Sequence, residues 1–168
     1  MDYQKQLNDW FSKFDQRMEV GVPNIVAETS VEFFRERFKS EEWDKVPWPN
    51  LEPKYAAKKT RGKGRILTRS GILQASIRPA EVNPQRVVIS AGNRKAPYAR
   101  VHNEGLRVKG IAKVKSYTNR NFMGKGKPQK IKAHTRNYDI QHKRRQFMGH
   151  SKYLNQAIIE RLTKAFNS

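Results

Sequence analysis

The sequence contains no cysteine among its 168 residues. Disulfide frameworks, cysteine-ligated zinc and thiol catalysis are therefore excluded. Long apolar runs are also missing, because no stretch approaches the roughly 18 apolar residues of a membrane-spanning helix. The opening residues, MDYQKQLNDW, lack the basic start and apolar run of a signal peptide. We therefore expect a protein that has no membrane partner and works in the cytoplasm where it is made.

Acidic side chains are scarce after residue 50. The five in residues 51–168 are widely separated and offer no pair suited to acid–base catalysis; they are Glu52, Glu81, Glu104, Asp139 and Glu160. The four histidines, none of them in an HExxH pair for a metal, are His102, His134, His142 and His150. The GKG triplets at 62–64 and 124–126 lack the spacing of a phosphate-binding loop. The sequence predicts a protein that is not an enzyme and binds no metal or cofactor.

Positive charge is unevenly placed. The chain has 35 Lys and Arg against 15 Asp and Glu, a formal net charge of +20. Residues 1–50 carry seven basic and ten acidic side chains, whereas residues 107–146 carry 13 basic side chains against Asp139 alone. This asymmetry indicates an acidic body with a basic working surface. The length is typical of one domain, here 1–168, and Leu, Ile, Val and Phe amount to only about 21% of it, which indicates a thin core.

Two helical stripes occupy the N-terminal region, residues 1–40. The first has the i, i+3, i+4, i+7 spacing of an amphipathic helix; its members are Leu7, Trp10, Phe11, Phe14 and Met18. Gly21 and Pro23 then punctuate the chain, and Pro23 suits the first turn of a following helix. The second stripe runs to about Phe38; its members are Ile25, Val26, Thr29, Phe33 and Phe38. We expect both stripes to pack into the core.

Strands are predicted in the middle of the chain. Ser76–Val82 and Arg86–Ala91 flank a turn, and the β-branched run 87–89 suits a strand buried on both faces. Residues 106–118 and 129–138 alternate loosely around a polar tip, which predicts a β-hairpin or loop arm over 106–143. The expected fold class is α+β: an antiparallel sheet with N-terminal helices and a C-terminal helix packed on it, plus this long basic β-hairpin arm.

Helix ends are marked at two further positions. PYARVHNEG reads as one or two helical turns closed by Gly105, which is able to adopt the left-handed conformation of a C-cap. Ser151 is a suitable N-cap for a last helix that reaches about Phe166. The run around Ser70-Gly71 fits a short helix or a corner between helix and strand.

The basic arm has three interpretations. It binds nucleic acid, with Tyr117, Phe122 and Tyr138 available to stack on bases; it is a solvated arm whose charge protects strand edges; or it embraces the acidic helices of a neighbouring subunit. The basic side chains that would make these contacts are Arg107, Lys109, Lys113, Lys115, Arg120, Lys125, Lys127, Lys130, Lys132 and Arg136. No known DNA-reading helix motif is present.

Four segments together resemble the tail-completion (virion morphogenesis) family of long-tailed bacteriophages and prophages. They are WDKVPWPNL, ILTRSGILQASI, PYARVHNEG and RRQFMGHS, in that order. Ser70 interrupts the usual Thr-Gly pair, Met148 replaces a common Leu, and residues 106–143 are longer and more basic than expected. The family motifs fall on Trp48, Leu67, Gly71, Leu73, Tyr98, His102, Gly105, Phe147, Gly149 and Ser151.

The resemblance implies a structural virion protein. It would form an oligomeric ring at the head-proximal end of the tail, complete or terminate the tail, and make the head–tail joining surface, after assembly in the host cytoplasm. Its partners would be further copies of itself, tail-tube and connector proteins, and DNA through non-specific contact. The motif residues would be structural: Tyr98 and His102 would fix a corner between sheet and helix.

Two other classes stay open at this point. One is a stand-alone basic nucleic-acid-binding protein, whose affinity would fall steeply with salt. The other is a nuclease built around His102 and Glu104.

Overall fold

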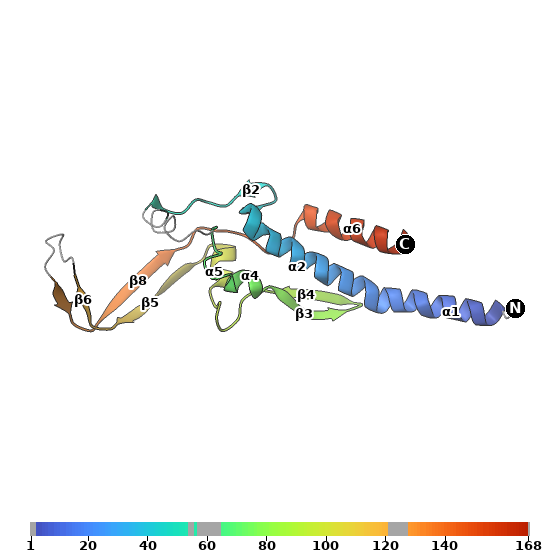
Figure 1. The fold of residues 1–168 in the computed structure, drawn as a ribbon, viewed down its shortest axis with the longest axis horizontal. Helices are drawn as coiled ribbons and strands as arrows, with labels where there is room; N and C mark the ends of the chain where they lie inside the picture. Colours follow the sequence, from blue (N-terminus) through green and yellow to red (C-terminus); the bar gives the residue numbers. More distant parts are fainter. Residues whose placement is uncertain (1–2, 54–55, 57–64, 121–127, 168) are drawn as a thin grey trace.

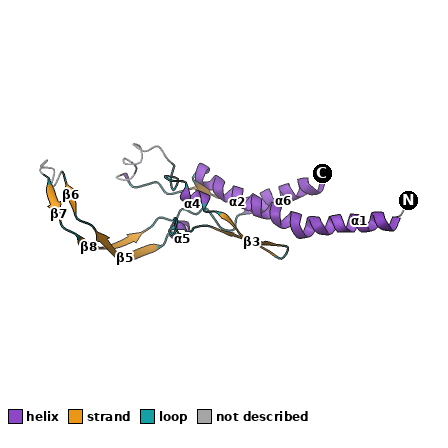
Figure 2. Cartoon of the chain, turned by 60° about the horizontal axis from the view of Figure 1, so that its bottom comes forward, coloured by secondary structure: helices purple, strands orange, loops and turns teal. Residues whose placement is uncertain are grey.

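The computed structural model describes residues 3–53, 56, 65–120 and 128–167. The chain is elongated, with helices at one end and a β arm at the other (Figure 1). Both termini lie at the helical end, and the arm bends away from the body toward its tip (Figure 2). No helix in the described part of the chain is long and apolar enough to cross a membrane.

The N-terminal region forms one continuous helical rod. It consists of α1 (Tyr3–Gln16), a π-helical turn η1 (Arg17–Gly21) and α2 (Val22–Ser40). The expected break at Gly21 does not occur, because this residue has helical dihedrals (φ −63°, ψ −52°). Pro23 lies in the first turn of α2, directly after the π-helical turn. Because proline has no N–H group, the rod lacks one backbone hydrogen bond at this position. The helix ends at Glu41, which is left-handed (φ 55°).

The strands pair as four separate two-stranded antiparallel ribbons. These are β1 (Glu42–Trp43) with β2 (Val46–Pro47), β3 (Arg78–Asn83) with β4 (Arg86–Ser90), β5 (Arg107–Val114) with β8 (His134–Gln141), and β6 (Tyr117–Asn119) with β7 (Gln129–Ile131). The α+β class and the long basic hairpin arm are confirmed. The ribbons are not joined into one continuous sheet, so the arm formed by β5, β6, β7 and β8 stands apart from β3–β4.

The β3–β4 ribbon packs along α2. Its turn is held by the Asn83 Oδ1 atom, which accepts hydrogen bonds from the backbone N–H groups of Gln85 (3.1 Å) and Arg86 (2.7 Å). The expectation that residues 87–89 are buried on both faces is wrong, since all three are only half-buried. A ribbon of two strands with a helix along it leaves one of its faces open, and a β-branched run does not reveal this.

The last helix, α6 (Lys152–Asn167), lies beside α2. Its apolar side chains are buried or half-buried, as expected from their spacing; they are Leu154, Ala157, Ile158, Leu162 and Ala165. Arg161 links the two helices by donating to the Glu32 carboxylate (2.6 Å) and to Thr29 Oγ1 (3.3 Å). The second N-terminal stripe is covered only in part by α6 and β3–β4. Thr29 and Phe38 are buried, and Ile25, Val26 and Phe33 are half-buried.

The core lies at the C-terminal end of α2, where α4 (Ile72–Ala75) and α5 (Ala99–Glu104) meet it. Its buried members are Val31, Phe34, Phe38, Trp48, Leu73, Ile77, Ala96, Ala99, Phe147 and Leu154. This end of the rod is the only place where helix, ribbon and loops surround one point within the described residues.

The first N-terminal stripe is not core, contrary to expectation. No residue of α1 is buried, and the side chains of its stripe are 42–58% exposed. The predicted helix is present, but α1 extends past the body, so no other described part of the chain covers most of it (Figure 1). Helical periodicity shows that a face needs a partner and does not show whether the same molecule supplies it.

Gly105 provides a test of the backbone geometry. It is left-handed (φ 69°, ψ 47°), and an added Cβ would lie 2.8 Å from the Arg144 backbone nitrogen. Gly105→Ala should therefore lower the free energy of unfolding by about 2 kcal/mol or more, as measured by urea denaturation.

Gly21→Ala is the matched control. Gly21 is helical and an added Cβ meets nothing within 4 Å, so the variant should be neutral or stabilised by up to about 1 kcal/mol. Equal effects of the two substitutions would contradict the left-handed requirement at Gly105.

Candidate functional site

The four motif segments, far apart in sequence, meet where the arm joins the helices. We call this region the junction and define it by residues from all four segments, which are Trp48, Leu73, Asn103, Arg145, Phe147 and Ser151. All of these except Asn103 are buried. The junction sits between α5, the start of α6 and the loop after β2, so it connects the arm to the body.

Arg145 is the buried charge of the junction, with 7% of its surface exposed. Its guanidinium donates to the backbone carbonyls of Pro49 (Nε, 3.0 Å) and Asn50 (Nη2, 3.3 Å). Its own N–H donates to the His102 carbonyl at 2.8 Å. Burial lowers the pKa of Arg145 from its ordinary value, and the Glu41 carboxylate opposes this effect. The residue thus links three segments through their backbone carbonyl groups, and these bonds satisfy its own buried donors.

Asn103 clamps the chain that leads into α6. Its Oδ1 atom accepts from the N–H groups of Phe147 (2.9 Å) and Met148 (3.0 Å), and its Nδ2 atom donates to the Met148 carbonyl (3.1 Å). Sequence reasoning did not single out this residue as a site. Its place directly before the Glu104-Gly105 helix end was the available signal, because an amide side chain there is suited to bind neighbouring backbone.

Trp48 joins the core to the junction. Its indole N–H donates to the Gln146 carbonyl at 2.7 Å. Its ring meets Phe38 edge-on at 5.6 Å, and Phe38 in turn lies 5.0 Å from Phe147. The motif residues Trp48 and Phe147 therefore share one aromatic cluster.

Ser151 caps α6, as its sequence position predicts. Its Oγ atom accepts from the N–H groups of Tyr153 (3.2 Å) and Leu154 (3.4 Å) and donates to the Asp44 carboxylate. Asp44 lies in the left-handed turn between β1 and β2 (φ 49°). The cap thus also fastens α6 to the turn that follows α2, which sequence reasoning did not anticipate.

The remaining motif residues shape the segments around the junction. Gly71 is left-handed (φ 68°) where α4 begins, and Leu73 is fully buried. Leu67 is also left-handed (φ 61°) and packs against the core. Gly149 has φ 150°, a value that favours glycine, and lies between the Asn103 clamp and the Ser151 cap.

His102 and His142 lie together, with ring centres 5.1 Å apart, although the sequence shows them as isolated residues. Burial, followed by the nearby His142 and Arg145, lowers the pKa of His102 from 6.5 to about 4. The Nδ1 atom of His102 is buried without a hydrogen-bond partner in the described residues. Tyr98 meets its ring edge-on at 5.7 Å. His102 is therefore a neutral packing residue at pH 7.

Glu104 does not join His102 in a catalytic pair. Its carboxylate accepts from Arg100 Nε on the next turn of α5, at 3.0 and 3.1 Å. Within the described ranges there is also no group of three or more acidic or histidine side chains placed to hold a metal ion. The described geometry gives the nuclease alternative no site.

The arm has one charged face and one largely apolar face. Directly opposed residues of β5 and β8 lie on the same face of the ribbon. The register places Lys109 opposite Asp139 on one face. There the Asp139 carboxylate accepts hydrogen bonds from Arg107 Nε (2.6 Å) and Nη2 (2.7 Å). The Lys109 Nζ atom lies 3.5 Å from Asp139 Oδ2. The other face, here called the apolar arm face, carries Val108, Ile140, Gly110, Tyr138, Ala112, Val114 and, nearer the tip, Arg136 and His134.

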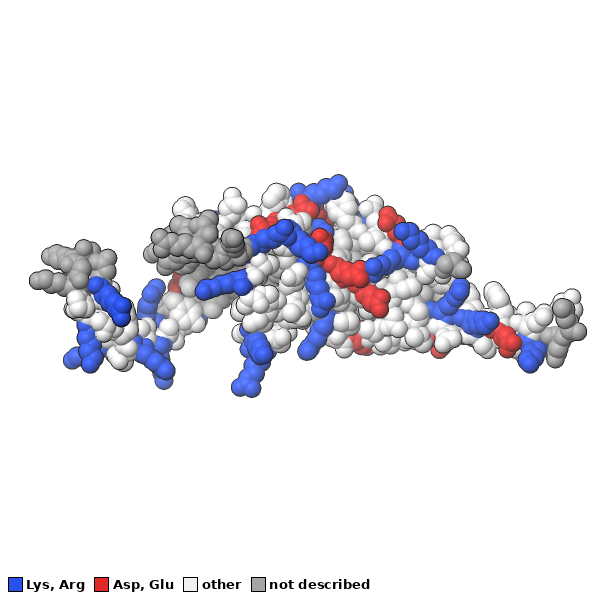
Figure 3. Space-filling view, in the orientation of Figure 1, with Lys and Arg blue, Asp and Glu red and all other residues white. Residues whose placement is uncertain are grey.

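The ten predicted basic residues do not form one surface. Lys113 shares the charged face with Arg107 and Lys109, whereas Arg136 is on the apolar arm face. Lys115, Arg120, Lys130 and Lys132 lie at or beside the β6–β7 tip, and basic side chains project from the arm in several directions (Figure 3). Lys125, Lys127 and Phe122 lie outside the described residues.

The two described aromatic residues proposed to stack on bases differ in their surroundings. The ring of Tyr138 covers Gly110 on the opposite strand, since a Cβ added there would lie 2.5 Å from the Tyr138 hydroxyl oxygen. Tyr138 is thus used inside the ribbon, as aromatic residues often are beside a strand glycine. Tyr117 is 51% exposed near the tip.

Comparison with known proteins identifies one family. The model of the phage virion morphogenesis family matches residues 2–167 of the chain. No curated protein and no solved structure matches the sequence or the fold.

Removing the Ser151 hydroxyl should destabilise the junction. Ser151→Ala loses the α6 cap and leaves Asp44 without its donor, so the free energy of unfolding should fall by about 1–2 kcal/mol. Ser12→Ala, an exposed change within α1, should alter it by less than about 0.5 kcal/mol. If both variants unfold at the same urea concentration, Ser151 does not act as this structural link.

Acid should weaken the junction through His102. Because its folded pKa of about 4 lies below 6.5, the unfolded chain binds a proton between these values that the folded chain does not. The contribution of neutral His102 is complete above pH 6.5 and is lost as the pH falls toward 4. The loss should be on the order of 1 kcal/mol, because the ring is only partly buried.

Urea denaturation of the wild type and of His102→Gln across this pH range measures the effect. The variant should lose stability less steeply than the wild type as the pH falls. Parallel pH profiles would show that His102 is not the responsible group.

Proposed function

The chain belongs to the phage virion morphogenesis family, a structural and assembly family, and on that premise we propose that it is a tail subunit of a phage or prophage. In this proposal it oligomerises as a ring at the head-proximal end of the tail, completes or terminates the tail, and forms the surface to which the head joins. Its partners are further copies, tail-tube protein and connector protein. It is assembled in the host cytoplasm.

One observation carries the proposal beyond the family. The chain exposes apolar side chains toward both ends of an elongated molecule. At one end is the stripe of α1, and in the arm are Ile111 (68% exposed), Tyr117 (51%) and Ile140 (49%). A two-stranded ribbon is at best marginally stable alone in water, and a large exposed apolar patch marks an interaction site. Surfaces at opposite ends suit head-to-tail contacts, which close into rings when the rotation between subunits allows it.

The motif residues support a structural role in this proposal. Each one described above holds backbone, fills the core or permits a turn, and the junction they build sets how the arm is carried by the helices. A subunit whose arm must reach a neighbour needs such a fixed base. Ordering a loosely held arm on binding would cost free energy and would lower its affinity for the neighbouring subunit.

The second candidate function is a stand-alone nucleic-acid-binding protein. It is supported by the composition of residues 51–168, which contain 28 basic and only five acidic side chains. The arm geometry favours it less, because basic side chains are divided between the two faces and Tyr138 is packed on Gly110. In the tail proposal the same charge makes non-specific contact with DNA that passes through the ring, or with acidic surface of an adjacent subunit.

Light scattering distinguishes the tail subunit from the stand-alone nucleic-acid-binding protein. The molar mass of nuclease-treated protein is measured at about 0.1 and 0.5 M salt. A discrete oligomer that persists at the higher salt is expected. A monomer that binds duplex DNA and releases it as salt rises would favour the second candidate.

A phage lysate tests the tail role directly. Without the protein, electron microscopy should show filled heads and separate tails, and addition of purified protein should restore joined, infective particles. Normal particles in its absence would overturn the proposal.

A further inference from the structure

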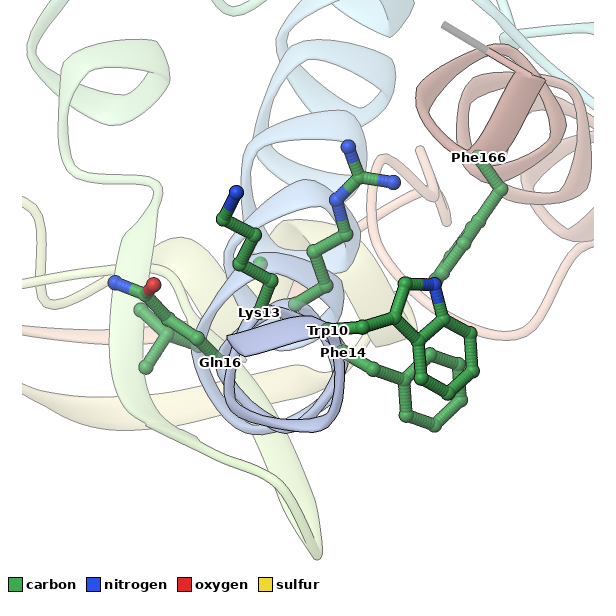
Figure 4. Close-up of a pocket in the computed structure, with 8 residues that line it drawn as sticks. Trp10, Lys13, Phe14, Gln16 and Phe166 are labelled. Atoms are coloured by element: carbon green, nitrogen blue, oxygen red, sulfur yellow. The ribbon is translucent and has the colours of Figure 1, made fainter. Parts of the chain in front are cut away.

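The apolar stripe of α1 ends in a notch beside the last helix. The notch has a volume of about 740 Å³ and is lined by Trp10, Lys13, Phe14 and Arg17 of the rod and by Phe166 at the end of α6. Trp10 and Phe14 stack at 5.6 Å and project to the same side of α1 as Phe166 (Figure 4). The surface is therefore hollow, aromatic and open where α6 stops.

The helix α1 lacks the packing contacts that normally stabilise a helix of 14 residues. None of its 14 residues is buried, whereas helices in proteins owe most of their stability to the packing of an apolar face. Its aromatic side chains are mostly packed on each other, as Trp10 is on Phe11 (5.1 Å) and on Phe14. A helix packed on α1, as α6 packs on α2, would supply the missing contacts.

Opposite charges flank the stripe on its two sides. At about 100° of rotation per residue, Lys13 and Arg17 fall on the side of Trp10, where both line the notch. Asp15 and Glu19 fall on the side of Phe11. We call these pairs the basic shoulder and the acidic shoulder. All four side chains are exposed, and none takes part in an ion pair among the described residues.

This arrangement of charge distinguishes two ways of pairing identical helices. If two copies of α1 packed antiparallel through their stripes, a twofold axis perpendicular to them would put acidic shoulder beside acidic shoulder and basic beside basic. If they packed parallel around an axis along the helices, each acidic shoulder would meet the basic shoulder of the next copy. Charges that flank an apolar seam set helix orientation in this way, and like charges across a contact are costly.

The heights of the charges also fit the parallel arrangement. Asp15 lies between Lys13 and Arg17 along the helix, about 3 Å from each at a rise of 1.5 Å per residue. Two parallel copies in register therefore bring Asp15 of one copy beside both basic side chains of the other without any axial shift.

We propose that α1 of a second copy of this chain docks parallel in the notch, with its acidic shoulder, Asp15 and Glu19, on the basic shoulder, Lys13 and Arg17. The contact is heterologous, since each copy offers one shoulder to each neighbour, and repetition of it builds a cyclic assembly. This inference deepens the proposed ring by naming the surface that closes it and rests on that proposal for its biological setting.

A second copy fits better than an unrelated helix because the chain itself supplies what the notch requires. The occupant must be helical, carry an aromatic stripe and be acidic on the correct side, and α1 has all three features. In a ring of such copies, each copy pairs its basic shoulder with one neighbour and its acidic shoulder with the other, whereas an unrelated acidic partner would leave the acidic shoulder of α1 exposed.

Charge reversal of one shoulder at a time tests the contact. Asp15→Lys/Glu19→Lys makes both shoulders basic, and Lys13→Glu/Arg17→Glu makes both acidic. Each variant alone should show a monomer mass by light scattering, and an equimolar mixture should associate into oligomers in which the two variants alternate, because each contact between unlike variants joins opposite charges. Since no residue of α1 is buried, the fold of the body should persist, as checked by its urea transition.

Asp9→Lys is the matched control. It makes one acid-to-base change of the same kind on the same helix, but on the side away from the stripe, so it should assemble like the wild type. If the shoulder variants also assemble like the wild type, or if their mixture stays monomeric, the inference is overturned.

The direction of the helices is tested by single cysteines in a chain that has none. In a parallel contact, Leu7→Cys should cross-link to itself under oxidation, and so should Met18→Cys. Cross-links that form only when the two variants are mixed would show an antiparallel contact and overturn the inference.

These outcomes are separable from those of the proposed function. A wild-type oligomer that survives the shoulder substitutions would leave the ring standing and remove α1 from its contact. A wild-type protein that stays monomeric up to its solubility limit would overturn the α1 contact, while the lysate experiment judges the tail role independently.

Discussion

The arrangement of the whole molecule depends on how residues 145–151 are held to α5. The Asn103 side chain binds the backbone of Phe147 and Met148, and the Arg145 N–H binds the His102 carbonyl. Through this strap the arm, which enters from β8, is coupled to α6, which leaves from Ser151. If the strap were free, α6 and the end of β8 would lose the hydrogen bonds that hold them to α5, and the arm would be joined to α5 through β5 alone. Its bonds are buried or half-buried, where loss of one partner leaves a group unsatisfied and is costly.

The body is small for the surface it carries. The core gathers at one end of a long rod, and the chain extends from it in two directions, toward α1 and toward the β6–β7 tip. Both extensions present apolar side chains to solvent, and residues 106–143, which include the arm, carry 11 basic side chains against one acidic, half of the formal net charge. Such a molecule buries a large part of its apolar surface only in contact with other molecules, which is the physical demand on a subunit of an assembly.

Local structure could be read well from the sequence because its signals are local. The stripes of α2 and α6, the turn after Asn83, the left-handed Gly105 and the Ser151 cap each follow from a few neighbouring residues. Less could be read of what the side chains touch. The stripe at Leu7 has the same spacing as the one in α2, yet only the latter has buried members, and the run at Val87 lies in a ribbon with an open face. The spacing of apolar residues shows which face of an element is apolar. It does not show whether another part of the protein packs against that face.

The sequence by itself determined the α+β composition, the positions of most helices and strands, the basic hairpin arm and membership of the family, because each depends on residue type and order. Only the tertiary structure decided that four motif segments form one junction, that Asn103 and Arg145 hold it, that His102 meets His142, and that α1 is left uncovered. These features join residues up to about a hundred positions apart. Contacts at such separation are set by how whole elements pack, and no short pattern of residues records that.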